Sequence, residues 1–168
     1  VLNMMPASQK VRDPFDLPYS IGDEQFVRSM GVLLGPPLAH GCEAKVLLNG
    51  DEIFPAMIEA IEAAKRSITF ETYIYWKGET GHRFSEALAR KAKAGVRCHV
   101  MLDWVGSQNC DEADVKTMED AGVEVERYHP LKWYNLARIN ERTHRKLLVV
   151  DGKVGFTGGV GIADEWTG

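Results

Sequence analysis

The chain has 168 residues, of which 45% are hydrophobic and 26% charged, so it can bury the core of one domain of ordinary size. Its net charge of −4, from 24 acidic and 20 basic residues, argues against a protein that coats nucleic acid with a broad positive surface. No apolar run approaches the roughly 20 residues of a membrane-spanning helix, and the three widely spaced cysteines predict neither a disulfide framework nor a zinc site.

Residues 1–40 are expected to form an extended arm with one short helix. Three prolines interrupt the first 21 residues, which show little hydrophobic periodicity: Pro6, Pro14 and Pro18. The pattern predicts a short amphipathic helix from Asp23 to Met30, before the break at Gly35-Pro36-Pro37. The regular domain is expected to span residues 41–168.

Helices and strands alternate along the regular domain. A brief strand is predicted at Lys45–Leu48, and Asp51 is expected to cap a helix that runs to about Lys65. Further apolar patterns predict strands at 67–75, 96–103 and 123–128 and helices at about 81–94 and 111–121. This alternation predicts an α/β fold with a mixed, largely parallel sheet and helices on both faces.

The segment from Thr143 to Gly159 is the most informative part of the chain. A strand at Leu147–Val150 would place His144 and Lys146 on one face by alternation. The turn signal Asp151-Gly152 predicts a hairpin to a last strand at 153–157. A nucleophile and a cation would then share one site.

These residue types suit attack on a phosphodiester. His144 is the predicted nucleophile, forming a phosphohistidine, and Lys146 the predicted ligand of a nonbridging phosphoryl oxygen. Gly158 and Gly159 are expected to let backbone amides approach the substrate. Asp151 lies too far along the strand to hold the same phosphate, so its expected role is to fix the turn or to bind nearby donors. Because lysine and backbone amides would stabilise the negative charge that develops on the phosphoryl oxygens, no metal or cofactor is predicted.

Glu71 lies within an apolar strand pattern, where an unpaired carboxylate is costly. It is expected either at a sheet edge or, as the favoured alternative, paired with a cation or histidine in the substrate site. Basic residues also gather around the motif, and they would attract an anionic substrate: Lys132, Arg138, Arg142, Arg145, Lys146 and Lys153.

The spacing H-x-K-x4-D, followed after six residues by Gly-Gly, resembles the signature of the phospholipase D superfamily, the HKD phosphodiesterases. The resemblance runs from about Val46 to Gly168, and over this range the chain is similar to the first half of bacterial cardiolipin synthase-like proteins. It implies a phospholipid substrate, transfer of a phosphatidyl group to an alcohol or to water, peripheral membrane contact, and a bacterial, membrane-associated location.

The resemblance also implies that the site is one half of two. The family pairs two such motifs, one histidine attacking while the other protonates the leaving oxygen, whereas this chain has one. A second motif is therefore expected either from a missing half of the same protein or from a partner chain. The domain is also expected to be incomplete at its C-terminal end. Gly161 stands where the family usually has asparagine, so a weakened or altered site is also expected.

Two other functions remain open. The first is a homodimeric nuclease of the same superfamily with one motif per chain, although the acidic net charge makes nucleic acid the less favoured partner. The second is a noncatalytic module that keeps the fold and binds phosphate.

Overall fold

The computed structural model describes residues 19–35, 39–130 and 142–168, which belong to two compact units, Val1–Lys45 and Val46–Gly168. In the first unit, α1 (Glu24–Leu34) begins after Asp23, whose carboxylate accepts a hydrogen bond from the backbone N–H of Gln25 at 2.8 Å. The predicted helix is confirmed and continues to Leu34. Residues 1–18 of the predicted arm lie outside the described residues.

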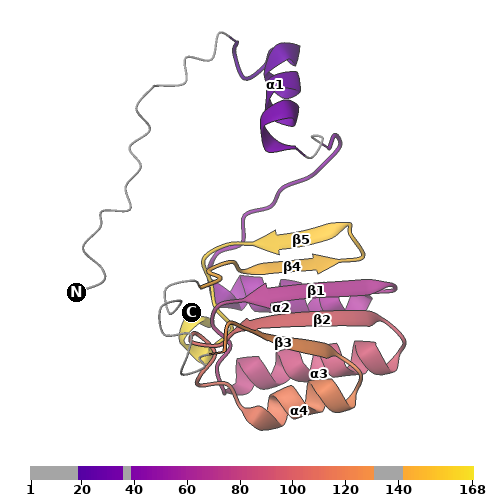
Figure 1. Cartoon of the computed structure of the whole chain (residues 1–168), viewed down its shortest axis with the longest axis vertical. Helices are drawn as coiled ribbons and strands as arrows, with labels where there is room; N and C mark the ends of the chain where they lie inside the picture. The colour runs from indigo at the N-terminus through magenta and orange to yellow at the C-terminus, as the bar shows by residue number, and fades with distance from the viewer. Residues whose placement is uncertain (1–18, 36–38, 131–141) are drawn as a thin grey trace, which may run out of the picture. The chain divides into compact units, whose positions relative to one another are not determined.

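The second unit is built on a five-stranded sheet (Figure 1). Its strands are β1 (Ser67–Thr72), β2 (Arg97–Asp103), β3 (Glu124–Tyr128), β4 (Leu147–Val150) and β5 (Val154–Thr157). They lie in the order β3-β2-β1-β4-β5, and β4 pairs antiparallel with both of its neighbours. Since β1, β2 and β3 pair in parallel, β4 alone runs against the other four strands. The predicted mixed, largely parallel sheet is confirmed.

Three helices cover the sheet: α2 (Asn49–Ala63), α3 (Glu79–Lys93) and α4 (Glu112–Asp120). In Figure 1, α3 lies between α2 and α4 and packs against both, so all three share one face. Apolar residues at alternate strand positions form the core beneath them: Ile68, Phe70, Val100, Leu102 and Leu148.

The helix arrangement corrects the expectation of helices on both faces. Within the described part of the second unit, no helix covers the opposite face of the sheet. The physical reason is that alternate positions on that face, such as Thr69 and His99, are polar and exposed. Only one face of the central strands therefore carries a continuous apolar surface for helices to bury.

One predicted strand does not form, and two predicted element boundaries are wrong. Lys45–Leu48 is extended but pairs with no strand of the described chain, and Val46 is 82% exposed. The following helix begins at Asn49 rather than after Asp51, and the carboxylate of Glu52 accepts a hydrogen bond from the Leu48 N–H at 2.9 Å. The strand predicted at 67–75 also ends early, at Thr72, because the chain bends after it.

The predicted hairpin between β4 and β5 is confirmed. Asp151 and Gly152 have φ angles of 55° and 65°, the left-handed pair that a two-residue type I′ turn requires. The Lys153 N–H closes the turn by donating to the Val150 carbonyl at 2.9 Å.

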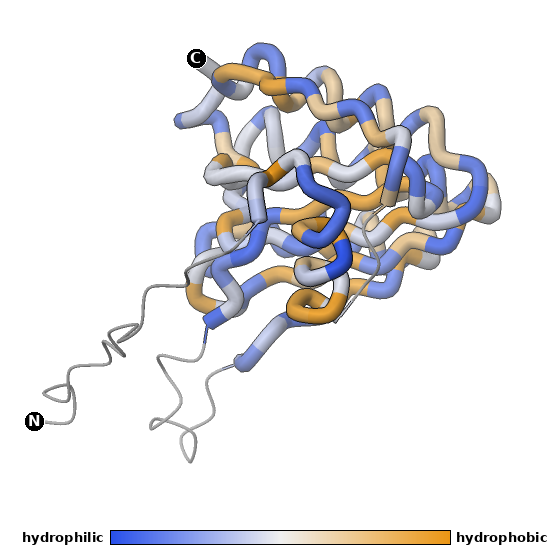
Figure 2. The backbone as a smooth tube through the Cα atoms, turned by 90° about the horizontal axis from the view of Figure 1, so that it is seen from above, coloured by the Kyte–Doolittle hydropathy of each residue, from blue (hydrophilic) through white to orange (hydrophobic). Residues whose placement is uncertain are grey.

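Figure 2 shows hydrophobic and hydrophilic residues alternating along the strands and helices of the second unit, as expected for elements with one buried side. None of the helices in the described ranges is long and apolar enough to cross a membrane.

Candidate functional site

The motif residues lie at one end of the sheet. Because β4 is antiparallel to β1 and Leu147 pairs with Glu71, the residues just before β4 lie near the carboxyl end of β1. Thr157 pairs with Leu147 from the other side, so Gly158 and Gly159 continue from β5 at the same end. Ligands of α/β sheets commonly bind at the carboxyl ends of strands.

His144 and Lys146 are in contact. The Lys146 ammonium lies 3.3 Å from Nδ1 and 3.4 Å from Nε2 of His144, and it donates to the His144 carbonyl at 3.1 Å. His144 is exposed and Lys146 half-buried, and this desolvation lowers the pKa of Lys146. The two side chains therefore lie on one side of the chain, as alternation predicts.

Tyr73, just beyond β1, completes this cluster. Its ring centroid lies 4.8 Å from that of His144, with the planes tilted by 52°. The Lys146 ammonium lies 5.5 Å from the same ring centroid. His144 and Lys146 therefore pack against an aromatic ring that directly follows β1.

Glu71, a predicted substrate ligand, contacts the residues that flank His144. Its Oε1 accepts from the hydroxyl of Thr143 and from Nε of Arg145, the latter at 3.1 Å. The Glu71 side chain is 10% exposed and that of Arg145 is 73% exposed. Glu71 is thus paired with a motif cation, and in this arrangement its carboxylate holds the neighbours of His144.

Asp103, at the end of β2, holds the same segment through its backbone. This fully buried carboxylate accepts from the Thr143 N–H at 3.2 Å. It also accepts from the N–H groups of Val105 and Gly106, at 2.9 and 3.1 Å. Arg142 adds a cation 3.8 Å from Asp103 Oδ1. Asp103 therefore joins the loop after β2 to the segment that carries His144.

Asp151 lies at the far end of β4 from His144. Its carboxylate accepts three backbone hydrogen bonds, from Lys65 at 2.9 Å, Arg66 at 2.7 Å and Ser67 at 2.9 Å. The bonds from Ser67, Lys65 and Arg66 lower the pKa of Asp151. These contacts are of the kind expected for a supporting carboxylate, since they tie the β4–β5 turn to the start of β1.

Replacing Asp151 with asparagine should change how stability depends on pH. The folded-state pKa of Asp151 is lowered below its unfolded value of about 3.9. The contribution of Asp151 to the free energy of unfolding is therefore present above that pH and is lost as the pH falls through the folded-state pKa. Urea midpoints measured from pH 6 to acid should therefore fall less steeply below about pH 4 in Asp151→Asn than in the wild type. Asp120→Asn, at an exposed carboxylate on α4, is the control; equal acid dependence in all three proteins would contradict the assignment.

The glycines after β5 differ in their surroundings. A Cβ added at Gly158 or Gly159 would meet nothing within 4 Å, so both face open space where a ligand has room to approach. Gly161 is buried, and an added Cβ would lie 2.6 Å from Cβ of Ile74. The space at position 161 is thus filled by a neighbouring residue, and an asparagine side chain does not fit there without movement.

Introducing the family asparagine should therefore destabilise this chain. Gly161→Asn is expected to lower the free energy of unfolding by about 1–3 kcal/mol because Ile74 must shift. Gly159→Ala, in open space, should change it by less than about 0.5 kcal/mol. Urea unfolding of both variants checks this, and a Gly161→Asn protein as stable as the wild type would refute it.

The predicted basic patch is only partly assembled. Arg142 and Arg145 contact Asp103 and Glu71 beside the motif. Lys153 is exposed in the β4–β5 turn, at the opposite end of β4, so the structure does not bring it to His144. Lys132 and Arg138 lie outside the described residues.

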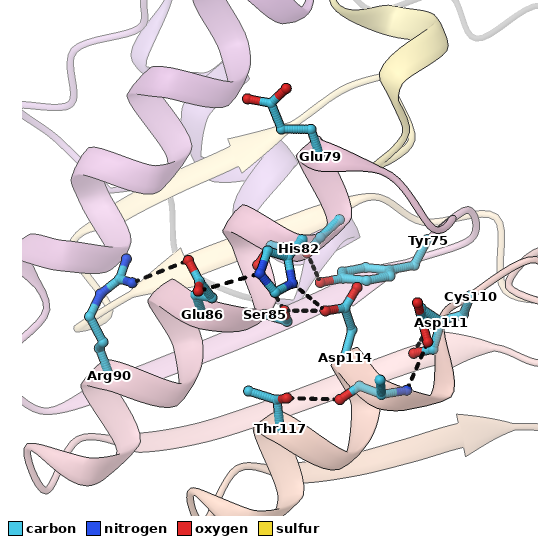
Figure 3. Close-up of polar contacts among 12 residues, drawn as sticks. Tyr75, Glu79, His82, Ser85, Glu86, Arg90, Cys110, Asp111, Asp114 and Thr117 are labelled. Carbon is cyan, nitrogen blue, oxygen red and sulfur yellow. Dashed lines mark hydrogen bonds and ion pairs between the residues drawn. The ribbon is translucent and has the colours of Figure 1, made fainter.

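A second polar cluster joins α3 to α4 (Figure 3). His82 Nδ1 lies 2.8 Å from Asp114 Oδ1, which also accepts from the Ser85 hydroxyl at 2.9 Å. The hydrogen bond with Asp114 raises the pKa of His82. The Ser85 hydroxyl donates to Asp114 and to the His82 carbonyl, so it contacts the carboxylate and a backbone oxygen instead of the imidazole. The cluster therefore fastens two helices and lacks the geometry of a serine nucleophile.

Tyr73, Asp103 and Thr143 are site residues that the sequence did not single out. Asp103 carried a usable signal, because it ends a predicted parallel strand, where polar residues meet at one sheet edge. Tyr73 carried none, since strand aromatics more often fill the core, as the fully buried Tyr75 does. In the described ranges, no three His, Cys, Asp or Glu side chains cluster so as to hold a metal ion.

Comparison with known proteins finds one matching family model. Residues 57–165 match the family described as cardiolipin synthase, PLD-like domain. The chain is 39% identical over 136 residues to cardiolipin synthase 1 of Bacillus anthracis, covering 80% of this chain and 26% of that protein. It is 34% identical over 168 residues to cardiolipin synthase of a Geobacillus strain, covering 99% and 31%. The chain thus spans about a quarter to a third of the length of these relatives.

Solved structures share the fold at lower identity. Nuc, a phospholipase D family member from Salmonella typhimurium, has a TM-score of 0.52 and 19% identity, covering 68% of this chain and 67% of its own. Phosphatidylserine synthase from Haemophilus influenzae has a TM-score of 0.56 and 18% identity, covering 73% and 29%.

Proposed function

Because the chain belongs to the family described as cardiolipin synthase, PLD-like domain, we propose that it supplies one catalytic half of a phosphodiester-cleaving, phosphatidyl-transferring enzyme. The observation that carries this proposal is the Lys146 ammonium 3.3 Å from the imidazole of His144. A nucleophile and a cation at one open site are what attack on an anionic phosphodiester requires.

The reaction proceeds through a covalent intermediate. A ring nitrogen of His144 attacks phosphorus, a P–N bond forms, and the bond from phosphorus to the leaving alcohol oxygen breaks. Lys146 binds a nonbridging oxygen, and backbone N–H groups at Gly158 and Gly159 add further donors. An acceptor alcohol, or water, then attacks the phosphohistidine and restores His144.

A second motif completes the site. The leaving oxygen needs a proton, and the acceptor must lose one, so a second histidine acts first as general acid and then as general base. The chain contains a single H-x-K-x4-D motif and spans 26% to 31% of the length of the cardiolipin synthases it matches, which supports a second motif from another segment or another copy.

Phospholipid is the proposed substrate, at a bacterial membrane. The support is that the relatives which match over most of this chain are bacterial cardiolipin synthases. A phospholipid must be reached at a bilayer surface, so peripheral membrane contact is part of the proposal.

A homodimeric nuclease of the same superfamily is the second candidate, since the H-x-K-x4-D motif of a second copy would complete its site. To separate the two, the chain is combined with a second H-x-K-x4-D motif, from another copy or another segment, to give the assembled enzyme. This enzyme is assayed in parallel on vesicles containing phosphatidylglycerol and on single-stranded DNA. Phosphatidyl transfer or hydrolysis on the vesicles is the expected result. Cleavage of DNA alone would favour the nuclease, and turnover of neither substrate would reject both enzymes.

A further inference from the structure

Tyr73 lies against both reactive side chains of the motif. Its ring contacts the imidazole of His144 at a centroid distance of 4.8 Å, inside the range of favourable aromatic pairs. The Lys146 ammonium lies 5.5 Å from the same centroid, inside the range of cation–π attraction. The three side chains therefore touch one another in pairs, since the ammonium is also 3.3 Å from the imidazole.

Tyr73 is itself held in place by the loop after β2. The Ser107 hydroxyl donates to the Tyr73 carbonyl at 3.2 Å. A Cβ on the buried Gly106 would lie 2.1 Å from that carbonyl oxygen, so the loop backbone packs directly against Tyr73. The Trp76 indole N–H fixes the same loop by donating to the Gly106 carbonyl at 2.8 Å.

We propose that Tyr73 is a positioning residue for the His144–Lys146 pair, its ring fixing the plane of the imidazole and holding the ammonium beside it. His144 is exposed, and within the part of the chain that the structure describes its ring contacts the Tyr73 ring and the Lys146 ammonium. Without the Tyr73 ring, the imidazole would keep its contact with the Lys146 ammonium but lose the surface that fixes its plane, so the nucleophilic nitrogen would lose its fixed direction. Such loss of orientation slows attack even when substrate binding is unchanged.

The lowered pKa of Lys146 agrees with this placement, because burial of the ammonium is its cause. The contacts that define Tyr73 exist in the chain without substrate, so the positioning itself is testable without catalysis. Its effect on rate rests on the proposed function.

The test is an NMR study of the 168-residue chain with labelled histidine rings. Wild type and Tyr73→Phe should both show nuclear Overhauser effects from His144 ring protons to the ring at position 73. Tyr73→Leu should shift the His144 ring resonances and broaden them as the ring becomes mobile. Tyr128→Leu is the matched control: Tyr128 contacts His129 at 4.1 Å, so the His129 resonances should move and those of His144 should not.

Identical His144 resonances in wild type and Tyr73→Leu would overturn the proposal, as would the absence of the Overhauser effect in wild type. If Tyr73→Leu fails to fold, the nuclear Overhauser effect between His144 and Tyr73 in the wild type still tests the proposal. In the enzyme assembled with a second motif, Tyr73→Leu should lower kcat by about 100-fold with little change in KM, and Tyr73→Phe should restore it. A wild-type enzyme without activity would refute the proposed function while leaving the NMR result valid.

Discussion

Changing His144 to asparagine should abolish phosphodiester cleavage by the assembled enzyme, with a loss in kcat of about 10⁴-fold or more. Asparagine has no ring nitrogen to form the P–N bond, so the covalent route is closed. The chain should still fold, because His144 is exposed and contributes nothing to the apolar core. Steady-state rates on vesicles, with circular dichroism of the variant, give the measurement.

A histidine on the same sheet provides the control. His99 is half-exposed on β2 and pairs with Glu124 at 2.9 Å, so His99→Asn removes an imidazole without touching the motif. Its kcat should stay close to that of wild type. If His144→Asn were as active as His99→Asn, the nucleophile assignment would be wrong.

Among the proposed variants, Asp103→Ala should show the largest loss of stability, with the free energy of unfolding lowered by about 3 kcal/mol or more. The change leaves three backbone N–H groups without their acceptor, those of Val105, Gly106 and Thr143. It also removes the carboxylate 3.8 Å from Arg142. The loss is large because Asp103 is fully buried, so water cannot replace its hydrogen bonds.

Asp111→Ala is the matched comparison. Asp111 also accepts a backbone hydrogen bond, from Ala113 at 2.9 Å, but it does so as an exposed helix cap. Its loss should cost about 1 kcal/mol. Urea unfolding of both variants measures the difference, and equal losses would show that Asp103 is an ordinary cap and no anchor of the motif segment.

Local patterns in the sequence were enough to predict most of the fold. Helical periodicity located α2, α3 and α4, and the Asp151-Gly152 signal located the hairpin turn, because these features depend on neighbouring residues. The strand at Lys45–Leu48 failed for the opposite reason: an extended apolar segment becomes a strand only if another strand pairs with it. The one-sided helix layer did have a local signal, because alternation places the polar Thr69 on the face opposite Ile68 and Phe70.

The same distinction applies to the site. The contact between His144 and Lys146 follows from two-residue alternation, so spacing alone predicts it. The cost of burying a carboxylate was enough to predict that Glu71 pairs with a cation. The identity of its partners was not predictable, because Thr143 and Arg145 precede β4 and lie more than 70 residues away in sequence. Tyr73 and Asp103 reach the motif only because β1 lies between β2 and β4.

The most direct measurement is to trap the covalent intermediate on His144. The assembled enzyme is quenched during turnover of labelled phosphatidylglycerol, and cleavage after glutamate then releases residues 142–165, in which His144 is the sole histidine. Mass spectrometry should find the phosphatidyl group on that peptide, attached through an acid-labile P–N bond at His144. Product formation with no adduct there, or with the adduct on another residue, would contradict the proposed role of His144.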